Sequence, residues 1–131
     1  MRAKRRILVV ESSDIMRRVL RDILWFYNYN VDCVDSADKA INLIENIYYD
    51  LVIVDYAVPW MNGIELTKQI RSKRPDLPVM GMSSNHKEDK IHFIKAGANV
   101  FLPKPLDFKA LLEAVSSTID TPIVPPDEPH T

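Results

Sequence analysis

The chain lacks three features that often reveal where a protein acts: paired cysteines, a long apolar run and an excess of one charge. Cys33 is the single cysteine among 131 residues, so no disulfide can form within the chain and a reducing compartment is expected. The basic start is followed by only four apolar residues, Ile7 to Val10, too few for a signal-peptide core or a membrane span. Lys plus Arg number 17 against 18 Asp plus Glu, and this net charge of -1 does not indicate binding to nucleic acid or to an anionic membrane. We therefore expect a cytoplasmic protein.

Apolar sequence is abundant enough for one folded core. Hydrophobic residues make up 47% of the chain and charged residues 27%, and a length of 131 residues fits a single domain. Five short apolar runs predict strands at residues 7–10, 31–34, 51–54, 79–82 and 100–102. Two of these runs, ILVV and LVIV, are apolar throughout, which is typical of strands that helices cover on both faces of a parallel sheet.

Helical periodicity separates the predicted strands. Apolar residues recur at helical spacing within residues 16–27, 37–47 and 108–119, and weaker stripes lie at 66–70 and 91–94. This alternation predicts an α/β fold, a three-layer, doubly wound sandwich of a five-stranded parallel sheet and five helices. The domain is expected to occupy residues 1–119. Residues 120–131, DTPIVPPDEPHT, contain four prolines and no periodicity, and are predicted to form a proline-rich tail or a truncated linker.

The two tryptophans are expected to differ in burial. Trp25 is predicted to pack at the end of the first helix, whereas Trp60, which follows Pro59 in the loop after the third strand, is predicted to be exposed.

Polar side chains follow several of the predicted strands directly. Glu11 and Ser12 follow the first strand, Asp55 the third, Ser83 the fourth and Lys104 the fifth. The carboxyl ends of parallel strands meet at one edge of the sheet, where side chains that do chemistry gather. Two neighbouring carboxylates resist joint ionisation, so Glu11 beside Asp55 indicates either a divalent cation or neutralisation by Lys104, and both interpretations remain open. Oxygen ligands of this kind suit Mg²⁺.

Four segments of the chain, in order and at matching spacing, resemble the signature blocks of response-regulator receiver domains. They are VVESSDIMRR, DLVIVDYAVPWMNGIEL, PVMGMSS and AGANVFLPKPLD, within residues 6–119. The resemblance implies a strand order of 2-1-3-4-5 and a cis peptide at Lys104-Pro105. It also implies a phosphorelay role in two-component signalling, in which a histidine kinase or a histidine phosphotransfer protein donates a phosphoryl group.

The same resemblance implies a role for each candidate site residue. Asp55 is the implied phosphoacceptor, Ser83 the switch hydroxyl that follows the phosphate, and Lys104 the lysine that pairs with the phosphate. Phe101 is the implied aromatic switch. The chain would then be a signalling switch and no enzyme, beyond catalysing its own phosphorylation and dephosphorylation. A downstream protein is expected to bind the face made by the fourth helix, fifth strand and fifth helix, and whether the chain forms a homodimer is left open.

The metal-binding residues depart from the family's pattern. The resemblance implies Mg²⁺ as cofactor, with Glu11, Asp55 and the backbone carbonyl of Ala57 as ligands. Receiver domains normally have two adjacent acids after the first strand, whereas this chain has Glu11 and the neutral Ser12. We therefore expect a weakened affinity for Mg²⁺. The same substitution supports a second hypothesis, a pseudo-receiver that acts as an interaction module without phosphorylation.

Two further functions are disfavoured by single features. A hydrolase of the haloacid-dehalogenase type needs a second Asp two residues after its nucleophile, and Ala57 stands there. A flavodoxin needs a glycine- and threonine-containing loop after the first strand to bind the flavin phosphate, and this chain lacks it.

Overall fold

The computed structural model describes residues 4–120, so the segment predicted to be a tail or linker lies outside the described residues except for Asp120. Strands and helices alternate along the chain, as the periodicity predicts. The strands are β1 (Arg6–Val10), β2 (Asn30–Val34), β3 (Leu51–Asp55), β4 (Val79–Ser83) and β5 (Val100–Pro103). The helices are α1 (Asp14–Phe26), α2 (Ala37–Asn46), α3 (Gly63–Lys73), α4 (His86–Ala96) and α5 (Phe108–Val115), which a π-helical turn, Ser116–Asp120, extends.

The five strands form one parallel sheet in the order β2-β1-β3-β4-β5, which confirms the predicted fold class and strand order. The two uniformly apolar strands, β1 and β3, lie inside the sheet and are buried along almost their whole length. In the described sheet β5 pairs only with β4, so Pro103 stands on an edge strand, where its missing N–H interrupts no ladder.

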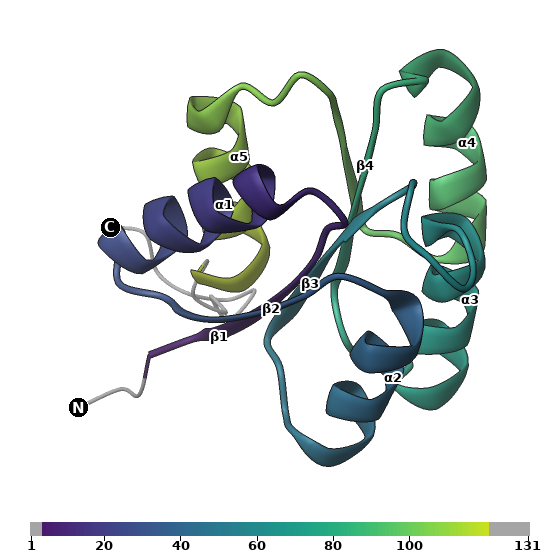
Figure 1. Cartoon of the computed structure of the whole chain (residues 1–131), viewed down its shortest axis with the longest axis horizontal. Coiled ribbons are helices and arrows are strands. Elements are labelled where there is room, and N and C mark those ends of the chain that lie inside the picture. Colours follow the sequence, from purple (N-terminus) through teal and green to yellow (C-terminus); the bar gives the residue numbers. More distant parts are fainter. Residues whose placement is uncertain (1–3, 121–131) are drawn as a thin grey trace, which may run out of the picture.

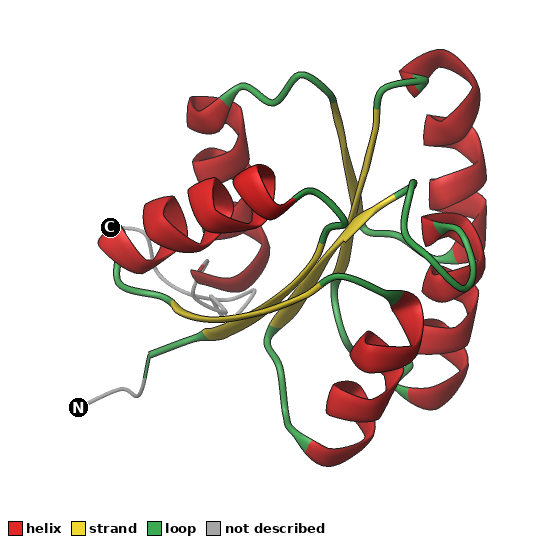
Figure 2. Cartoon of the chain, in the orientation of Figure 1, coloured by secondary structure: helices red, strands yellow, loops and turns green. Residues whose placement is uncertain are grey.

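Helices cover both faces of the sheet, as Figures 1 and 2 show: α1 and α5 lie on one side, and α2, α3 and α4 on the other. The side chains of β1 alternate between the two cores that result. Ile7 and Val9 pack with residues of α1 and α5, whereas Leu8 and Val10 pack with residues of α2, α3 and α4. This double burial explains why the strand reads as an uninterrupted apolar run.

Short-range signals fix several helix ends. The side chains of Ser13, Asn62 and Asp107 accept hydrogen bonds from backbone N–H groups in the first turns of α1, α3 and α5. Gly97 ends α4 with a φ of 115°, a left-handed conformation that glycine adopts without strain. The expectation for Trp25 was wrong: its side chain is 65% exposed, because Leu20 and Leu24 form the buried stripe of α1 and Trp25 is rotated away from it.

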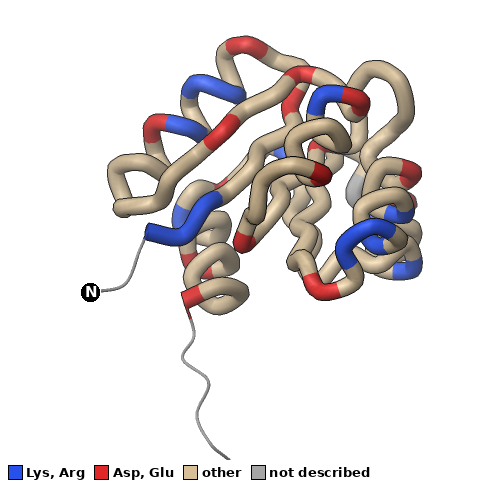
Figure 3. The backbone as a smooth tube through the Cα atoms, turned by 90° about the horizontal axis from the view of Figure 1, so that it is seen from below, with Lys and Arg blue, Asp and Glu red and all other residues tan. Residues whose placement is uncertain are grey.

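The surface of the described residues carries both charges. Figure 3 shows basic and acidic positions interspersed along the backbone, in keeping with the net charge of -1. No helix within residues 4–120 combines the length and apolar character that a membrane crossing requires.

Candidate functional site

The predicted site residues meet at the carboxyl edge of the sheet. Asp55 ends β3 and is only 4% exposed, Glu11 follows β1, Ser83 ends β4, and Lys104 follows β5. The backbone N–H of Lys104 donates to the carbonyl of Ser83 at 2.9 Å, which fixes the loop after β5 against the end of β4. All four side chains line one cavity of about 480 Å³. The structure thus brings together residues that are as much as 93 positions apart in sequence.

Lys104 bridges the two buried carboxylates. Its Nζ atom donates to Oε1 of Glu11 at 2.6 Å and lies 3.0 Å from Oδ1 of Asp55. The other oxygen of Glu11, Oε2, accepts from the backbone N–H of Ser13 at 3.0 Å. Lys104 is therefore a counter-ion of the acid pair, as one of the two sequence interpretations has it, and its single positive charge leaves the pair able to attract a divalent cation as well.

Burial and mutual charge shift the pKa values of this network. Burial, and then repulsion from Glu11, raise the pKa of Asp55 from 3.8 to about 6, against the lowering effect of Lys104. Burial alone would lower the pKa of Lys104, but its hydrogen bonds to Glu11 and Asp55 outweigh that effect and raise the pKa above its ordinary value. Near neutral pH the site therefore holds an ionised Asp55 beside a protonated Lys104.

Ser12 lies where a second acid was expected, and it contacts a predicted metal ligand. Its hydroxyl donates to the backbone carbonyl of Ala57 at 2.8 Å. Arg17 holds the same loop, because its Nη1 atom donates to the carbonyls of Glu11 and Ser12 at 2.7 and 3.0 Å. The Ala57 carbonyl keeps one lone pair free, since a carbonyl oxygen accepts two hydrogen bonds.

The oxygens of the site suit a hard divalent cation in kind. Glu11, Asp55 and the Ala57 carbonyl supply the oxygen atoms that Mg²⁺ accepts, but only two of these groups are charged, and both contact Lys104. Within residues 4–120, no three side chains of the Asp, Glu, His and Cys types cluster in a way that could hold a metal ion. The site therefore offers Mg²⁺ ligand atoms of the right kind, but only a small negative charge to attract the ion.

The hydroxyl of Ser83 is engaged by α4. It donates to Oδ2 of Asp89 at 2.6 Å and accepts from the backbone N–H of Asn85 at 3.1 Å. Asp89 lies in the first turn of α4, is 8% exposed, and lines the same cavity as Asp55. The sequence analysis missed this residue, and the available signal was weak: an acid in a helical first turn six positions after Ser83.

Phe101 packs between the sheet and α4. Its ring centroid is 5.7 Å from that of Phe93, a fully buried residue of α4. Gly81, the β4 residue beside Phe101, leaves room for this pair, because a methyl group there would overlap the Phe93 ring. The contact joins β5 to α4, and a switching role for Phe101 stays a prediction.

Comparison with known proteins settles the family. The family model described as the response regulator receiver domain matches residues 7–116. The chain belongs to the response-regulator receiver domain family. Among curated relatives, "Response regulator MprA" of Mycobacterium sp. (strain KMS) is 32% identical over 127 residues, covering 95% of this chain and 55% of the relative. "Two-component response regulator PhoP" of Pseudomonas aeruginosa is 29% identical over 107 residues, covering 81% of this chain and 48% of that protein. The receiver chain thus spans about half the length of the curated relatives it matches.

Solved receiver structures share the fold. The CheY-like receiver domain protein from Methanospirillum hungatei JF-1 superposes with a TM-score of 0.86 at 26% identity, covering 90% of this chain and 95% of that chain. The receiver domain of the sensor histidine kinase PA1611 from Pseudomonas aeruginosa PAO1 gives a TM-score of 0.84 at 25% identity, covering 91% and 100%. That structure has a magnesium ion coordinated in its active-site cleft.

Two other predictions from the sequence concern residues outside the charge network. The Lys104-Pro105 peptide is cis, as the resemblance implied. Trp60, in the loop that follows β3, is 79% exposed, which confirms the expectation for this residue.

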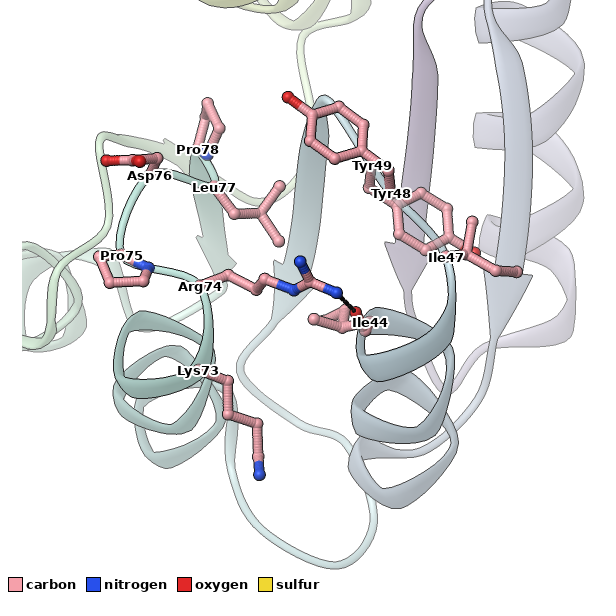
Figure 4. Close-up of a pocket in the computed structure, with 10 residues that line it drawn as sticks. All are labelled: Ile44, Ile47, Tyr48, Tyr49, Lys73, Arg74, Pro75, Asp76, Leu77 and Pro78. Carbon is pink, nitrogen blue, oxygen red and sulfur yellow. Dashed lines mark hydrogen bonds between the residues drawn. The ribbon is translucent and has the colours of Figure 1, made fainter.

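A second cavity of the receiver lies at the opposite edge of the sheet, where β3 and β4 begin (Figure 4). It has a volume of about 340 Å³ and is lined by residues 44, 47–49 and 73–78. The guanidinium of Arg74 crosses it and donates to the carbonyl of Ile44 at 2.9 Å, and Lys73 pairs with Glu45 at 3.0 Å. The cavity contains none of the predicted site residues.

Proposed function

We propose that this receiver domain accepts a phosphoryl group on Asp55 from a phosphohistidine of a histidine kinase or a histidine phosphotransfer protein. The observation that carries the proposal is the buried Asp55 carboxylate, held 3.0 Å from the ammonium of Lys104 in an open cavity. A carboxylate oxygen of Asp55 would attack the phosphorus while the bond from phosphorus to the histidine nitrogen breaks, and the histidine keeps that electron pair.

Protonation states in the cavity favour this reaction near neutral pH. A pKa of about 6 leaves the Asp55 carboxylate ionised, and hence nucleophilic, above that pH. The raised pKa of Lys104 keeps its ammonium charged, so it can pair with the phosphoryl oxygens as negative charge accumulates on them. Lys104 would then exchange its contact with the Asp55 carboxylate for one with the acyl phosphate.

Mg²⁺ is the proposed cofactor, with weakened affinity. Glu11, Asp55 and the Ala57 carbonyl would hold the ion, whose charge would offset that of the phosphoryl oxygens. Two observations support weak binding: Ser12 provides a hydroxyl in place of a carboxylate, and the positive charge of Lys104 already contacts both acids. A phosphoryl group would supply the oxygens that the protein lacks.

The proposed output is a change on the face made by α4, β5 and α5. Beneath this face, the contact between the buried Phe93 and Phe101 links α4 to β5, and Ile91 and Ile94 are exposed on α4. Exposed apolar side chains of this kind suit a protein partner. We propose a cytoplasmic signalling switch that is read by a protein, with no direct contact to nucleic acid.

The test is to incubate the protein with acetyl phosphate at increasing Mg²⁺ concentrations and to record intact mass. We expect one phosphoryl group per chain, at Mg²⁺ concentrations above those usual for receivers with an acid pair, and none on Asp55→Asn. Equal modification of Asp55→Asn, or no modification at any Mg²⁺ concentration, would overturn the proposal.

A phosphorylation-independent interaction module is the second candidate. It is favoured by the bridging Lys104 and by the hydrogen bond from Ser12 to Ala57, which together satisfy the site without added groups. A protein partner that binds wild type and Asp55→Ala with equal affinity, with and without acetyl phosphate, would support this candidate over the first.

A further inference from the structure

Ser83 donates its hydroxyl proton to Asp89, a carboxylate that is not one of the two acids bridged by Lys104. Ser83 is 3% exposed, and its Oγ donates to Oδ2 of Asp89 at 2.6 Å. The backbone N–H of Asn85 already donates to the same Oγ at 3.1 Å. Because a hydroxyl has one proton, Ser83 can donate to Asp89 or to another acceptor in the cavity, but not to both.

The buried carboxylate of Asp89 is stabilised by this hydrogen bond from Ser83. Asp89 is the fourth residue of α4 and is largely buried at the helix start, where the partial positive charge of the helix favours an anion. None of the ion pairs among residues 4–120 includes it. If Ser83 turned away, the Asp89 carboxylate would lose the hydrogen bond that Ser83 donates to it while still shielded from water, which is unfavourable.

The first turn of α4 has few other restraints. Asn85, its N-cap residue, accepts no capping bond on its side-chain oxygen, and its amide nitrogen donates to the exposed Glu88 at 3.2 Å. The middle of the helix is anchored firmly by the fully buried Phe93, which fills the space over Gly81. The bond from Ser83 to Asp89 therefore ties the loosely capped end of α4 to β4.

We propose that Asp89 is a positioning residue that holds the Ser83 hydroxyl toward α4 until a phosphoryl group on Asp55 competes for it. The inference rests on the proposed function of Asp55, since the competitor is the phosphoryl group. That group carries about two negative charges and would lie in the cavity that all three residues line. When Ser83 donates to it, Asp89 is left without its donor, and the first turn of α4 must shift to let water reach the carboxylate. Phosphorylation is thereby converted into a movement at the start of α4.

Amide hydrogen exchange of the first turn of α4, measured on the unmodified protein, tests the link. In Asp89→Ala we expect exchange to rise by roughly ten-fold or more, because a hydrogen bond to a charged group is lost. Ser83→Ala is expected to raise exchange by a similar factor. The double variant, with Ser83→Ala and Asp89→Ala combined, is expected to raise exchange no more than either single substitution. If the two effects multiply instead, Asp89 and Ser83 act independently and the proposal is overturned.

Three controls separate positioning from general destabilisation. Asp89→Asn keeps an acceptor oxygen for Ser83 and is expected to retain most of the protection. Glu88→Ala removes a neighbouring carboxylate that does not contact Ser83, and should leave exchange at residues 89 and 90 unchanged. Exchange in β3, read in the same experiment, reports global unfolding. Loss of protection in Asp89→Asn equal to that in Asp89→Ala would contradict the hydrogen-bond mechanism.

The competition itself is tested with beryllofluoride, a phosphoryl mimic, and Mg²⁺. In the wild type the mimic is expected to raise exchange at the start of α4 to the level of unmodified Asp89→Ala, and in Asp89→Ala to cause no further rise. If the wild type fails to bind beryllofluoride although the exchange data show that Asp89 and Ser83 act together, that result would overturn the function proposed for Asp55. Bound mimic with unchanged exchange would overturn the role of Asp89 alone.

Discussion

The Asp55→Asn variant should be more stable against unfolding than the wild type at neutral pH, and this advantage should shrink as the pH falls. Asparagine has nearly the shape of a protonated aspartic acid but carries no charge. In the folded protein, burial and the nearby Glu11 raise the pKa of Asp55 from 3.8 to about 6. A raised carboxyl pKa means that the folded state binds a proton more readily than the unfolded state, so ionisation of Asp55 opposes folding.

The magnitude follows from the shift in pKa. The destabilisation appears as the pH rises above 3.8, grows until about pH 6, and is constant above that value. Its upper limit for a shift of roughly two units is about 3 kcal/mol. At pH 5 about half of this remains, so the advantage of Asp55→Asn over the wild type should fall by on the order of 1 kcal/mol between pH 8 and pH 5.

Urea unfolding followed by circular dichroism at pH 5, 6, 7 and 8 measures this difference. Asp22→Asn is the matched control, since Asp22 is an exposed carboxylate on α1 whose replacement should give parallel profiles. If Asp55→Asn is no more stable than the wild type at pH 8, or if its advantage does not change with pH, the account of Asp55 as a buried carboxylate under electrostatic strain is wrong.

Three other substitutions have defined outcomes. Ser12→Asp adds a carboxylate beside the proposed Mg²⁺ ligands and should tighten Mg²⁺ binding by on the order of ten-fold or more, measured by Trp60 fluorescence; unchanged affinity would contradict the reason given for weak binding. Gly81→Ala places a methyl group against the ring of Phe93 and should reduce the free energy of unfolding by about 1–3 kcal/mol in urea titrations; unchanged stability would contradict the tight packing of Phe93 over Gly81. Asp107→Ala removes a side chain that accepts from two N–H groups of α5 and should cost about 1 kcal/mol in the same assay, and a neutral result would show that water caps the helix equally well.

The sequence predicted the fold because each element had a local signal. The continuous apolar runs of β1 and β3 reflect burial on both faces, and Gly97 marks the end of α4. Trp25 shows the limit of such reasoning: an aromatic residue near a helix end can be packed or exposed, and its angle from the stripe of Leu20 and Leu24 decided the outcome.

Strand order also predicted which residues would meet, but not which contacts they would make. The carboxyl-end rule selects Glu11, Asp55 and Lys104, whereas the bridge that Lys104 forms between the two acids depends on side-chain geometry. Asp89 was not predicted, because an acid in the first turn of a helix is ordinary there and its bond to Ser83 depends on how α4 packs on β4.

Chemical trapping of the modified residue tests the central claim most directly. Treatment of the acetyl-phosphate-modified protein with borohydride reduces an aspartyl phosphate to homoserine, and peptide mass spectrometry then locates it. The account predicts homoserine at position 55 and unmodified acids at Glu11 and Asp89, the other buried carboxylates of the cavity. Label at either of those residues, or its absence from position 55 when the intact mass shows a phosphoryl group, would contradict it.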